Sequence, residues 1–155
     1  MLYLLFQLGQ NRYALETSRI VEVVPLLAIQ QLPQAPSGVA GIFNYRGRPV
    51  PAVDLGLVTL GKPASERLST RIIIVNYSDD SGTNHLLGLV AERVTELIRR
   101  DAKDFVDSGV KLSAAPYLGP VLMDGSSAIQ LIYEHLLLPQ PVRQRLFAGP
   151  QALCH

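Results

Sequence analysis

Short apolar runs, each closed by turn-forming residues, follow one another through the first part of the chain. Residues 2–8 form such a run, residues 9–11 (Gly-Gln-Asn) supply a turn, and residues 13–15 resume the apolar pattern. Two β-prone runs around a short glycine-containing turn are typical of a β-hairpin. The β-branched run at 20–24, which Pro25 closes, predicts a further strand.

The segment 39–55 carries a second hairpin pattern. Its two β-prone arms flank Arg46 and Gly47, and glycine readily adopts the positive φ of a tight turn. Pro49 and Pro51 lie two residues apart and cannot donate to a β-ladder, so this side of the second arm is predicted to be a sheet edge or a bulge. An edge strand beside a basic turn is a place where a partner can dock.

The middle of the chain mixes a helical signal with strand signals. Asp54 is predicted to cap a short helix that runs to about Leu60 and that Gly61 ends. The β-branched, apolar run 71–77 predicts a buried strand. The segment 85–98 is ambiguous, because its apolar residues fit a helical stripe while its glycine and β-branched residues suit a strand.

The last third of the chain contains another hairpin. Apolar runs at 118–123 and 128–132 flank an Asp-Gly pair at 124–125, which is a strong hairpin signal. Residues 134–138 predict a final helical turn, and residues 141–155 are predicted to be a loose tail. The whole pattern predicts about nine or ten short strands separated by turns, which is typical of an all-β barrel or sandwich.

The length of 155 residues favours a single domain. We expect this domain to span residues 1–140, with the stretch 61–70 as an approximate division between two sub-barrels whose strands can exchange. Lys and Arg number 14 against 13 Asp and Glu, a net charge of +1, which weakens the case for a nucleic-acid binder. The apolar N-terminus lacks the basic region of a signal peptide, and the uncharged run 23–45 contains more Pro and Gln than a membrane helix tolerates. We therefore expect a cytoplasmic protein without direct membrane insertion.

Catalytic chemistry has weak support in this sequence. The segment Gly56–Lys62 matches the P-loop spacing G-x-x-x-x-G-K, but Pro63 stands where a Ser or Thr hydroxyl would hold magnesium. His85, His135 and His155 are far apart and lack the spacing of metal ligands. The sequence therefore predicts no metal and no cofactor.

Binding is the remaining class of function, and the turn at Arg46 is its best candidate. The single cysteine, Cys154, lies next to the C-terminus, so the chain can form neither an internal disulfide nor a cysteine-based metal cage. A nucleotide-binding enzyme that uses Gly56–Lys62 stays open as an alternative, and so does a small β-barrel nucleic-acid binder. Thermal stabilisation by nucleotide and binding of oligonucleotides test these two alternatives.

The segment 41–55 resembles the signature of the CheW family of chemotaxis coupling proteins. In that family a Gly and an Asn precede an Arg-Gly pair, and the strand that follows carries a Pro and ends in Asp-Leu. The resemblance extends in order over residues 2–138, nearly the whole chain. The matching signature positions are Gly41, Asn44, Arg46, Gly47, Pro51, Asp54 and Leu55.

This resemblance implies a fold and a function. The fold is two packed SH3-like, five-stranded β-barrels with short helical turns, in which residues 88–98 are largely strand. The function is that of a non-enzymatic adaptor, which couples the cytoplasmic tip of a chemoreceptor, a methyl-accepting chemotaxis protein, to the regulatory domain of a CheA-type histidine kinase. Receptor docking in the family uses the groove between the barrels. Carried over by match, the binding residues are Ile20, Glu22, Gly41, Asn44, Arg46 and Gly47.

Three positions depart from the family pattern. Glu92 stands where Asp is usual, Tyr133 falls near a usual Asp of the closing strand, and Tyr45 replaces the usual Leu before the arginine. These departures suggest a divergent paralogue that serves a specialised chemosensory array.

Overall fold

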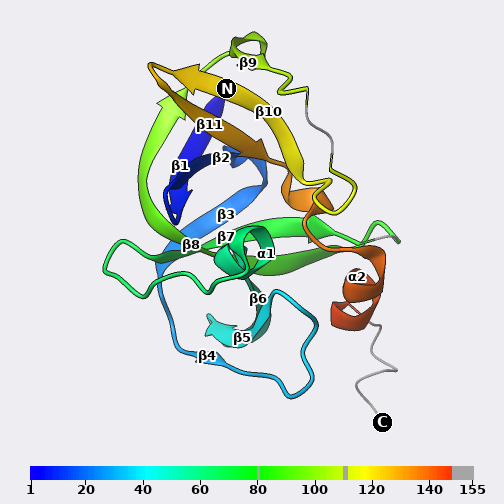
Figure 1. Cartoon of the computed structure of the whole chain (residues 1–155). Helices are drawn as coiled ribbons and strands as arrows, with labels where there is room; N and C mark the ends of the chain where they lie inside the picture. The colour runs from blue at the N-terminus through cyan, green and yellow to red at the C-terminus, as the bar shows by residue number, and fades with distance from the viewer. Residues whose placement is uncertain (80, 110–111, 148–155) are drawn as a thin grey trace.

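Two small β-barrels share one long strand, β8 (Asn84–Arg99), in the computed structural model of the chain (Figure 1). The structure describes residues 1–79, 81–109 and 112–147. Within that part, each barrel has five strands of at least six residues, with β8 counted in both, and one strand of two residues. The predicted all-β fold of two five-stranded barrels is confirmed. None of the described helices is long and apolar enough to cross a membrane.

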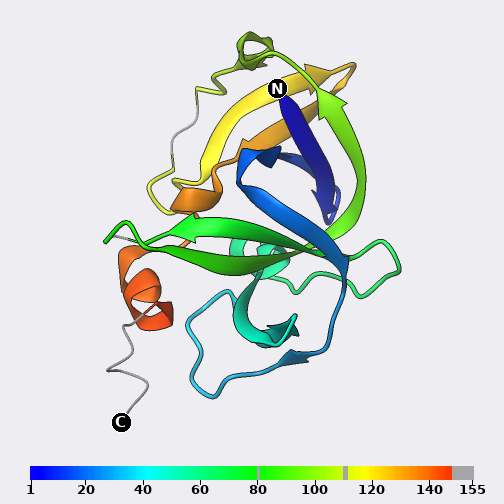
Figure 2. The same cartoon turned by 180° about the vertical axis from the view of Figure 1, so that it is seen from behind.

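The first barrel is built from strands in the middle of the chain. They are β3 (Ile20–Pro25), β4 (Ile29–Gln30), β5 (Val39–Tyr45), β6 (Arg48–Asp54), β7 (Arg71–Ser78) and the first half of β8. Their spatial order is β3-β7-β8-β6-β5-β4, and only the β6–β8 pair is parallel. The two ends of this order, β3 and β4, are the open edges of the barrel; in Figure 2 β3 crosses the middle of the view in front, and β4 lies below it.

The second barrel joins the two ends of the chain. Its strands are β1 (Leu2–Leu8), β2 (Asn11–Glu16), the second half of β8, β9 (Phe105–Val106), β10 (Leu118–Asp124) and β11 (Ser127–Ile132). β2 pairs in parallel with β11, which places the N-terminal hairpin against the last strand. Among the described residues, the 3-10 helices η1 (Thr17–Arg19) and η2 (Ala102–Asp104) lie between strands, and η3 (Glu134–Leu136) follows β11.

The loop at 61–70 does not divide the barrels, so that part of the sequence prediction is wrong. It connects the helix α1 (Leu55–Leu60) to β7, and the strands on either side of it, β6 and β7, both belong to the first barrel. The barrels are instead joined through β8 and through the crossing from β2 to β3. The boundary between the barrels is set by pairing between strands that are far apart in sequence, and it cannot be predicted from the composition of the chain.

The central strands are buried on both faces, because successive side chains point alternately into two different hydrophobic clusters. On β7, Ile72 and Ile74 belong to the cluster inside the first barrel, whereas Ile73 and Val75 belong to the cluster between the barrels. This is why residues 71–77 read as a continuous apolar run. Each fully buried aliphatic side chain contributes about 1.5–3 kcal/mol, so the interface between the barrels stabilises both of them.

β8 is a strand throughout, as the family resemblance implies. The apolar residues of this segment do not alternate cleanly with polar ones, because Leu87, Leu89 and Ala91 face the other barrel while Val90 lies inside the first one. This is why the sequence pattern also fits a helix. The strand bends at Arg93, whose φ of 47° is left-handed, where its pairing with β1 shifts register. The bend lets one strand serve two barrels.

The local predictions around α1 are confirmed. The Asp54 carboxylate accepts the backbone N–H groups of Gly56 at 2.9 Å and Leu57 at 3.2 Å, and Gly61 ends the helix with a φ of 73°. The predicted edge is also observed, because β8 pairs with only the last three residues of β6. The prolines Pro49 and Pro51 lie before that stretch.

Residues 141–147 do not form a loose tail, so this prediction is wrong for them. The helix α2 (Gln140–Leu146) begins after Pro139, and its Val142 and Leu146 pack against the cluster between the barrels. The Phe147 ring stacks on His85, with 4.4 Å between the ring centroids. These three apolar residues share one face of the helical turn, a short signal that the Pro, Gln and Arg around it obscure. Residues 148–155, with Cys154 and His155, lie outside the described part of the chain.

Candidate functional site

The turn between β5 and β6 is tied to β3 by three side chains. One carboxylate oxygen of Glu22, on β3, accepts a hydrogen bond from the Tyr45 hydroxyl at 2.6 Å and one from the Arg46 guanidinium at 2.8 Å. The Arg46 guanidinium also lies 5.3 Å from the centroid of the Tyr45 ring. We call Glu22, Tyr45 and Arg46 the turn cluster. It spans the side of the first barrel where β3 and β4 are not paired with each other.

The turn cluster orients Arg46 while leaving most of it accessible. The Arg46 side chain is 72% exposed, so its ion pair with Glu22 contributes at most about 1 kcal/mol to stability. The hydrogen bond to Glu22, followed by burial, raises the pKa of the Tyr45 hydroxyl above its usual value, so the phenol stays a donor at neutral pH. Within the described part of the chain, Glu22 is the only hydrogen-bond partner of the Arg46 guanidinium, so its remaining N–H groups can meet a carboxylate or a carbonyl of a partner.

Asn44 and Gly47 shape the turn itself. Arg46 and Gly47 have φ values of 53° and 85°, the pair of left-handed residues that a type I′ turn requires. The Asn44 side-chain oxygen accepts the Gly47 backbone N–H at 2.7 Å. These two residues therefore hold Arg46 at the tip of the hairpin.

Gly41 and Ile20 lie apart from the turn cluster. At Gly41, φ is 146° and an added Cβ would lie 2.0 Å from the carbonyl oxygen of Gln30, so only glycine lets β4 approach β5 this closely. The half-buried Ile20 packs against the cluster between the barrels. Of the six predicted site residues, the structure brings Glu22, Asn44, Arg46 and Gly47 together at one turn.

Sequence reasoning missed two features of this region. Tyr45 was noted only as a departure from the family pattern, yet its hydroxyl is a direct partner of Glu22. Val21 and Val23, on either side of Glu22, are 45% and 37% exposed, although a β-branched run reads as buried. The position of β3 at an edge of the first barrel explains this exposure, and no local signal reports it.

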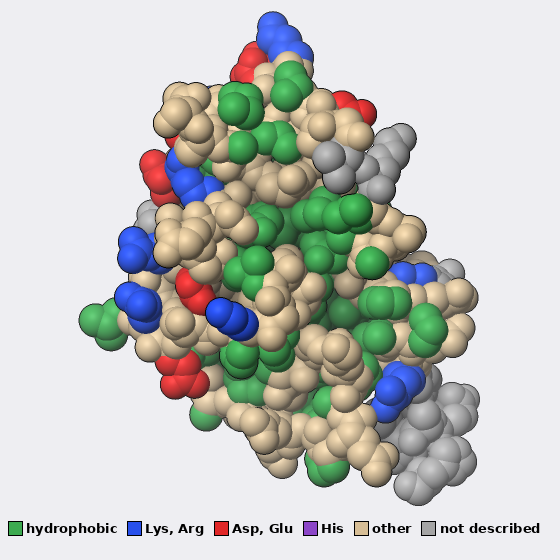
Figure 3. Space-filling model, viewed as in Figure 1, with side chains coloured by type: hydrophobic (Ala, Val, Ile, Leu, Met, Phe, Trp, Pro, Cys, Tyr) green, Lys and Arg blue, Asp and Glu red, His purple; other side chains and the backbone are tan. Residues whose placement is uncertain are grey.

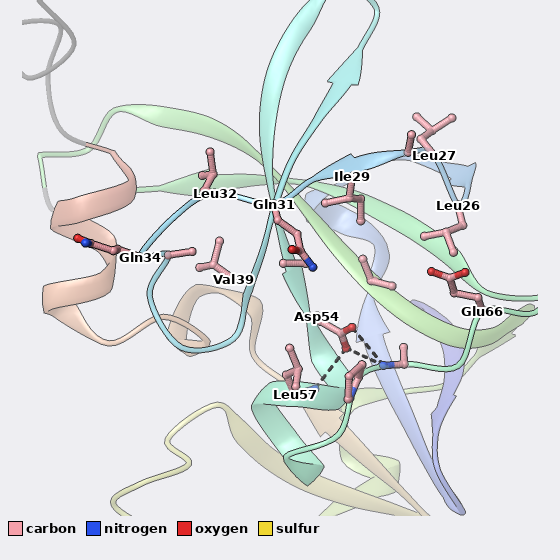
Figure 4. Close-up of a pocket in the computed structure, with 16 residues that line it drawn as sticks. Leu26, Leu27, Ile29, Gln31, Leu32, Gln34, Val39, Asp54, Leu57 and Glu66 are labelled. Carbon is pink, nitrogen blue, oxygen red and sulfur yellow. Dashed lines mark hydrogen bonds between the residues drawn. The ribbon is translucent and has the colours of Figure 1, made fainter.

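A hollow beside the first barrel is lined by Asp54 together with mainly aliphatic side chains (Figure 4). Its volume is about 730 Å³. Burial raises the pKa of the Asp54 carboxyl, and hydrogen bonds from the backbone of Ala64, Leu57 and Gly56 oppose this rise. Because these three N–H groups occupy the carboxylate, Asp54 holds α1 and the following loop in place. The lining is mainly aliphatic and comes largely from residues 26–40: Leu26, Leu27, Ala28, Ile29, Gln31, Leu32, Gln34, Ala35, Val39 and Ala40.

The P-loop-like segment has no phosphate cradle. The backbone N–H groups of Gly61 and Lys62 donate to carbonyls within α1, at 3.2 and 3.3 Å, so neither points to a free anion position. His85 is paired with Asp79, at 2.6 Å between Nε2 and Oδ2. In the described ranges, no group of three or more His, Cys, Asp or Glu side chains could hold a metal ion.

Comparisons with known proteins agree with this architecture. The family model of the CheW-like domain matches residues 2–138. The chain is 31% identical over 94 residues to the chemotaxis protein CheW of Helicobacter pylori, which covers 61% of this chain and only about half (54%) of that protein's length. It is 30% identical over 146 residues to the protein FrzA of Myxococcus xanthus, covering 92% of this chain and 88% of FrzA.

A solved structure shows the same fold. The scaffolding protein TtCheW of Thermoanaerobacter tengcongensis superposes with a TM-score of 0.77 at 25% sequence identity, covering 89% of this chain and 87% of that one. Its fold consists of two SH3-like β-barrel subdomains, as described here for β1–β11. With the family model covering nearly its whole length, the chain belongs to the CheW-like domain family.

Proposed function

We propose that this protein is a non-enzymatic adaptor of a bacterial chemosensory array. It couples the cytoplasmic tip of a chemoreceptor to the regulatory domain of a CheA-type histidine kinase, and it acts in the cytoplasm beside the receptor array. Two observations on relatives support this: the Helicobacter pylori relative is a chemotaxis protein, and the similar solved structure is a scaffolding protein. The nucleotide-binding enzyme has no comparable support.

The observation that carries the proposal is the turn cluster beside an apolar edge strand. Receptor tips are helical hairpins, and an amphipathic helix docks on an apolar surface with polar groups at its border. On β3, Ile20, Val21 and Val23 supply the apolar contact, and the oriented guanidinium of Arg46 supplies a charge-assisted hydrogen bond. Modest contacts of this kind suit an array, because multivalency multiplies their effect.

The six predicted binding residues divide by role in this proposal. Ile20 and Arg46 contact the receptor directly. Glu22, Asn44 and Gly47 hold Arg46 in place, and Gly41 holds the neighbouring strands together. The departures at Tyr45, Glu92 and Tyr133 fit a paralogue that serves a specialised array.

The test reverses the charge at the turn. We expect Arg46→Glu to fold normally, because an exposed ion pair contributes at most about 1 kcal/mol, and to recruit a receptor-tip fragment at least about tenfold more weakly. Arg99→Glu, at an exposed position of β8, makes the same change in net charge and is the control. Co-purification of wild-type protein with both a receptor and a histidine kinase supports the adaptor class. Unchanged receptor recruitment by Arg46→Glu contradicts this site.

A further inference from the structure

A polar recess lies beside α1, which is at the front of the molecule in the view of Figure 1. It has a volume of about 410 Å³, and four segments meet there: the β1–β2 turn, α1, the loop at 61–70 and the bend of β8. In Figure 1 this loop extends to the left, and Figure 3 shows basic and acidic side chains gathered on that side of the same face. The recess is lined by Gln7, Gly9, Gln10, Gly56, Leu60, Lys62, Pro63, Ser65, Arg67, Glu92 and Arg93.

Three cations and one carboxylate line this recess. Lys62, Arg67 and Arg93 are exposed, and none of them forms an ion pair with another described residue. The carboxylate, Glu92, accepts the Ser65 backbone N–H at 2.7 Å. A chain with a net charge of only +1 thus concentrates unpaired positive charge in one concave place, where a ligand of opposite charge is attracted.

The backbone at Arg93 indicates that its side chain matters. Its φ of 47° is left-handed, a conformation that costs a non-glycine residue on the order of 1 kcal/mol. Gly or Asn would adopt this bend at lower cost. An arginine at the bend therefore indicates that its guanidinium has a role that offsets this cost. Within the described part of the chain the guanidinium forms no ion pair, so we infer that its partner is outside this chain.

The recess suits carboxylates on a polypeptide better than a phosphate. Phosphate sites rely on free backbone N–H groups, but the N–H groups of Lys62, Ser65 and Arg67 already donate to Gly56 O, Glu92 Oε2 and Thr70 Oγ1. Guanidinium groups pair with carboxylates and phosphates alike, so the occupied backbone N–H groups are what favour carboxylates here, and the test below includes inorganic phosphate.

Apolar side chains beside the recess point to the same kind of ligand. Leu68, next to Arg67 in the loop, is 97% exposed, and Leu60, in the lining, is 41% exposed. An apolar side chain beside unpaired arginines is the composition of a protein interface, where such anchors are covered by a partner.

We propose that this recess, together with Leu68, is a second docking surface, which binds an acidic segment of a partner protein that carries an apolar residue. The segment's carboxylates pair with Arg67, Arg93 and Lys62, and its apolar side chain covers Leu68 and Leu60. This surface is separate from the turn cluster, so it adds a second contact to an adaptor and does not depend on the first.

The test uses a fluorescent Glu-rich peptide with one leucine, and the same peptide with Gln in place of Glu. We expect the acidic peptide alone to bind the wild-type protein, more weakly as salt rises. Arg67→Gln and Arg93→Asn should each weaken binding about tenfold. Arg93→Asn keeps a residue that tolerates the left-handed bend, so its melting temperature should not fall. Arg99→Gln changes the net charge equally and should bind like the wild type.

Three results overturn the proposal. They are absence of salt-sensitive binding by the acidic peptide, equal binding by the Arg67, Arg93 and Arg99 variants, and displacement of the peptide by inorganic phosphate at a site that depends on the same arginines. The last result identifies a small-anion site. Arg46→Glu should bind the peptide normally, so failure of the adaptor proposal at the turn cluster and failure of this one are distinguishable.

Discussion

The β5–β6 turn and the loop at 61–70 both present cations, but they hold them differently. At the turn, Arg46 is oriented by Glu22 and Tyr45, and Asn44 fixes the hairpin beneath it. In the loop, Arg67 has no ion-pair partner in the described chain. An oriented guanidinium favours recognition of one geometry, whereas unpaired cations favour long-range, salt-sensitive attraction. We therefore expect the turn to set specificity and the loop to set association rate.

Gly41→Ala should have the largest effect on stability. It changes β5, the strand that leads into the β5–β6 turn. The new Cβ would meet the backbone carbonyl of Gln30 at 2.0 Å, which no side-chain movement can relieve. We expect a loss of about 3 kcal/mol in the free energy of unfolding, measured by urea denaturation. Gly47→Ala is the matched control, since its Cβ would meet nothing within 4 Å and only the positive φ is strained. Equal losses in the two variants contradict this explanation.

Asp54→Ala should loosen the loop region and leave the turn unchanged, because Asp54 joins the end of β6 to α1 and the start of the loop. Its carboxylate accepts N–H groups from Gly56 and Leu57 in α1 and from Ala64 in the loop. Leaving these groups unsatisfied should cost about 2 kcal/mol. Amide hydrogen exchange should rise at Ala64 and in α1 while the hairpin turn at Asn44–Gly47 keeps its protection. Faster exchange confined to the turn would reverse the assignment.

Tyr45→Phe should produce a smaller loss and should test how far Arg46 depends on its neighbours. The change removes the hydroxyl that donates to Glu22 but keeps the ring beneath the Arg46 guanidinium. We expect about 1 kcal/mol of lost stability and a two- to fivefold weaker receptor interaction, on the order expected for a loosened side chain. A receptor affinity equal to that of the wild type would show that Arg46 needs no orientation by the turn cluster.

Asp79→Asn should have the smallest effect on stability and serves as a reference variant, because Asp79 belongs neither to the β5–β6 turn nor to the loop at 61–70. Hydrogen bonds from Ser81, followed by the pairing with His85, hold the pKa of the Asp79 carboxyl well below its usual value. A lowered folded-state pKa stabilises the protein above the unfolded value near 4. This contribution disappears as the pH falls through the folded value. Thermal melts should show a weaker acid dependence for Asp79→Asn than for the wild type, and an unchanged dependence contradicts the pairing.

Much of the local structure was predictable because the signals lie close together in the chain. The cap at Asp54 and the stop at Gly61 are seven residues apart, and the turn at Arg46–Gly47 needs only its own backbone preferences. The contact of Glu22 with Arg46 was not predictable from spacing, because it needs β3 and the β5–β6 turn to meet across the first barrel. Their assignment to one site came from the family resemblance, and their role in binding stays a prediction.

The sequence by itself determined the strands, the turns and the family, because alternating apolar residues, glycines at left-handed positions and the Asn-x-Arg-Gly signature act over a few residues. Tertiary structure alone decided that the N-terminal hairpin completes the second barrel, that α2 packs against the core between the barrels, and that Lys62, Arg67 and Arg93 share one recess. These outcomes depend on which distant segments pair and pack, and the free energy of such contacts belongs to the assembled barrels and to no single stretch of chain.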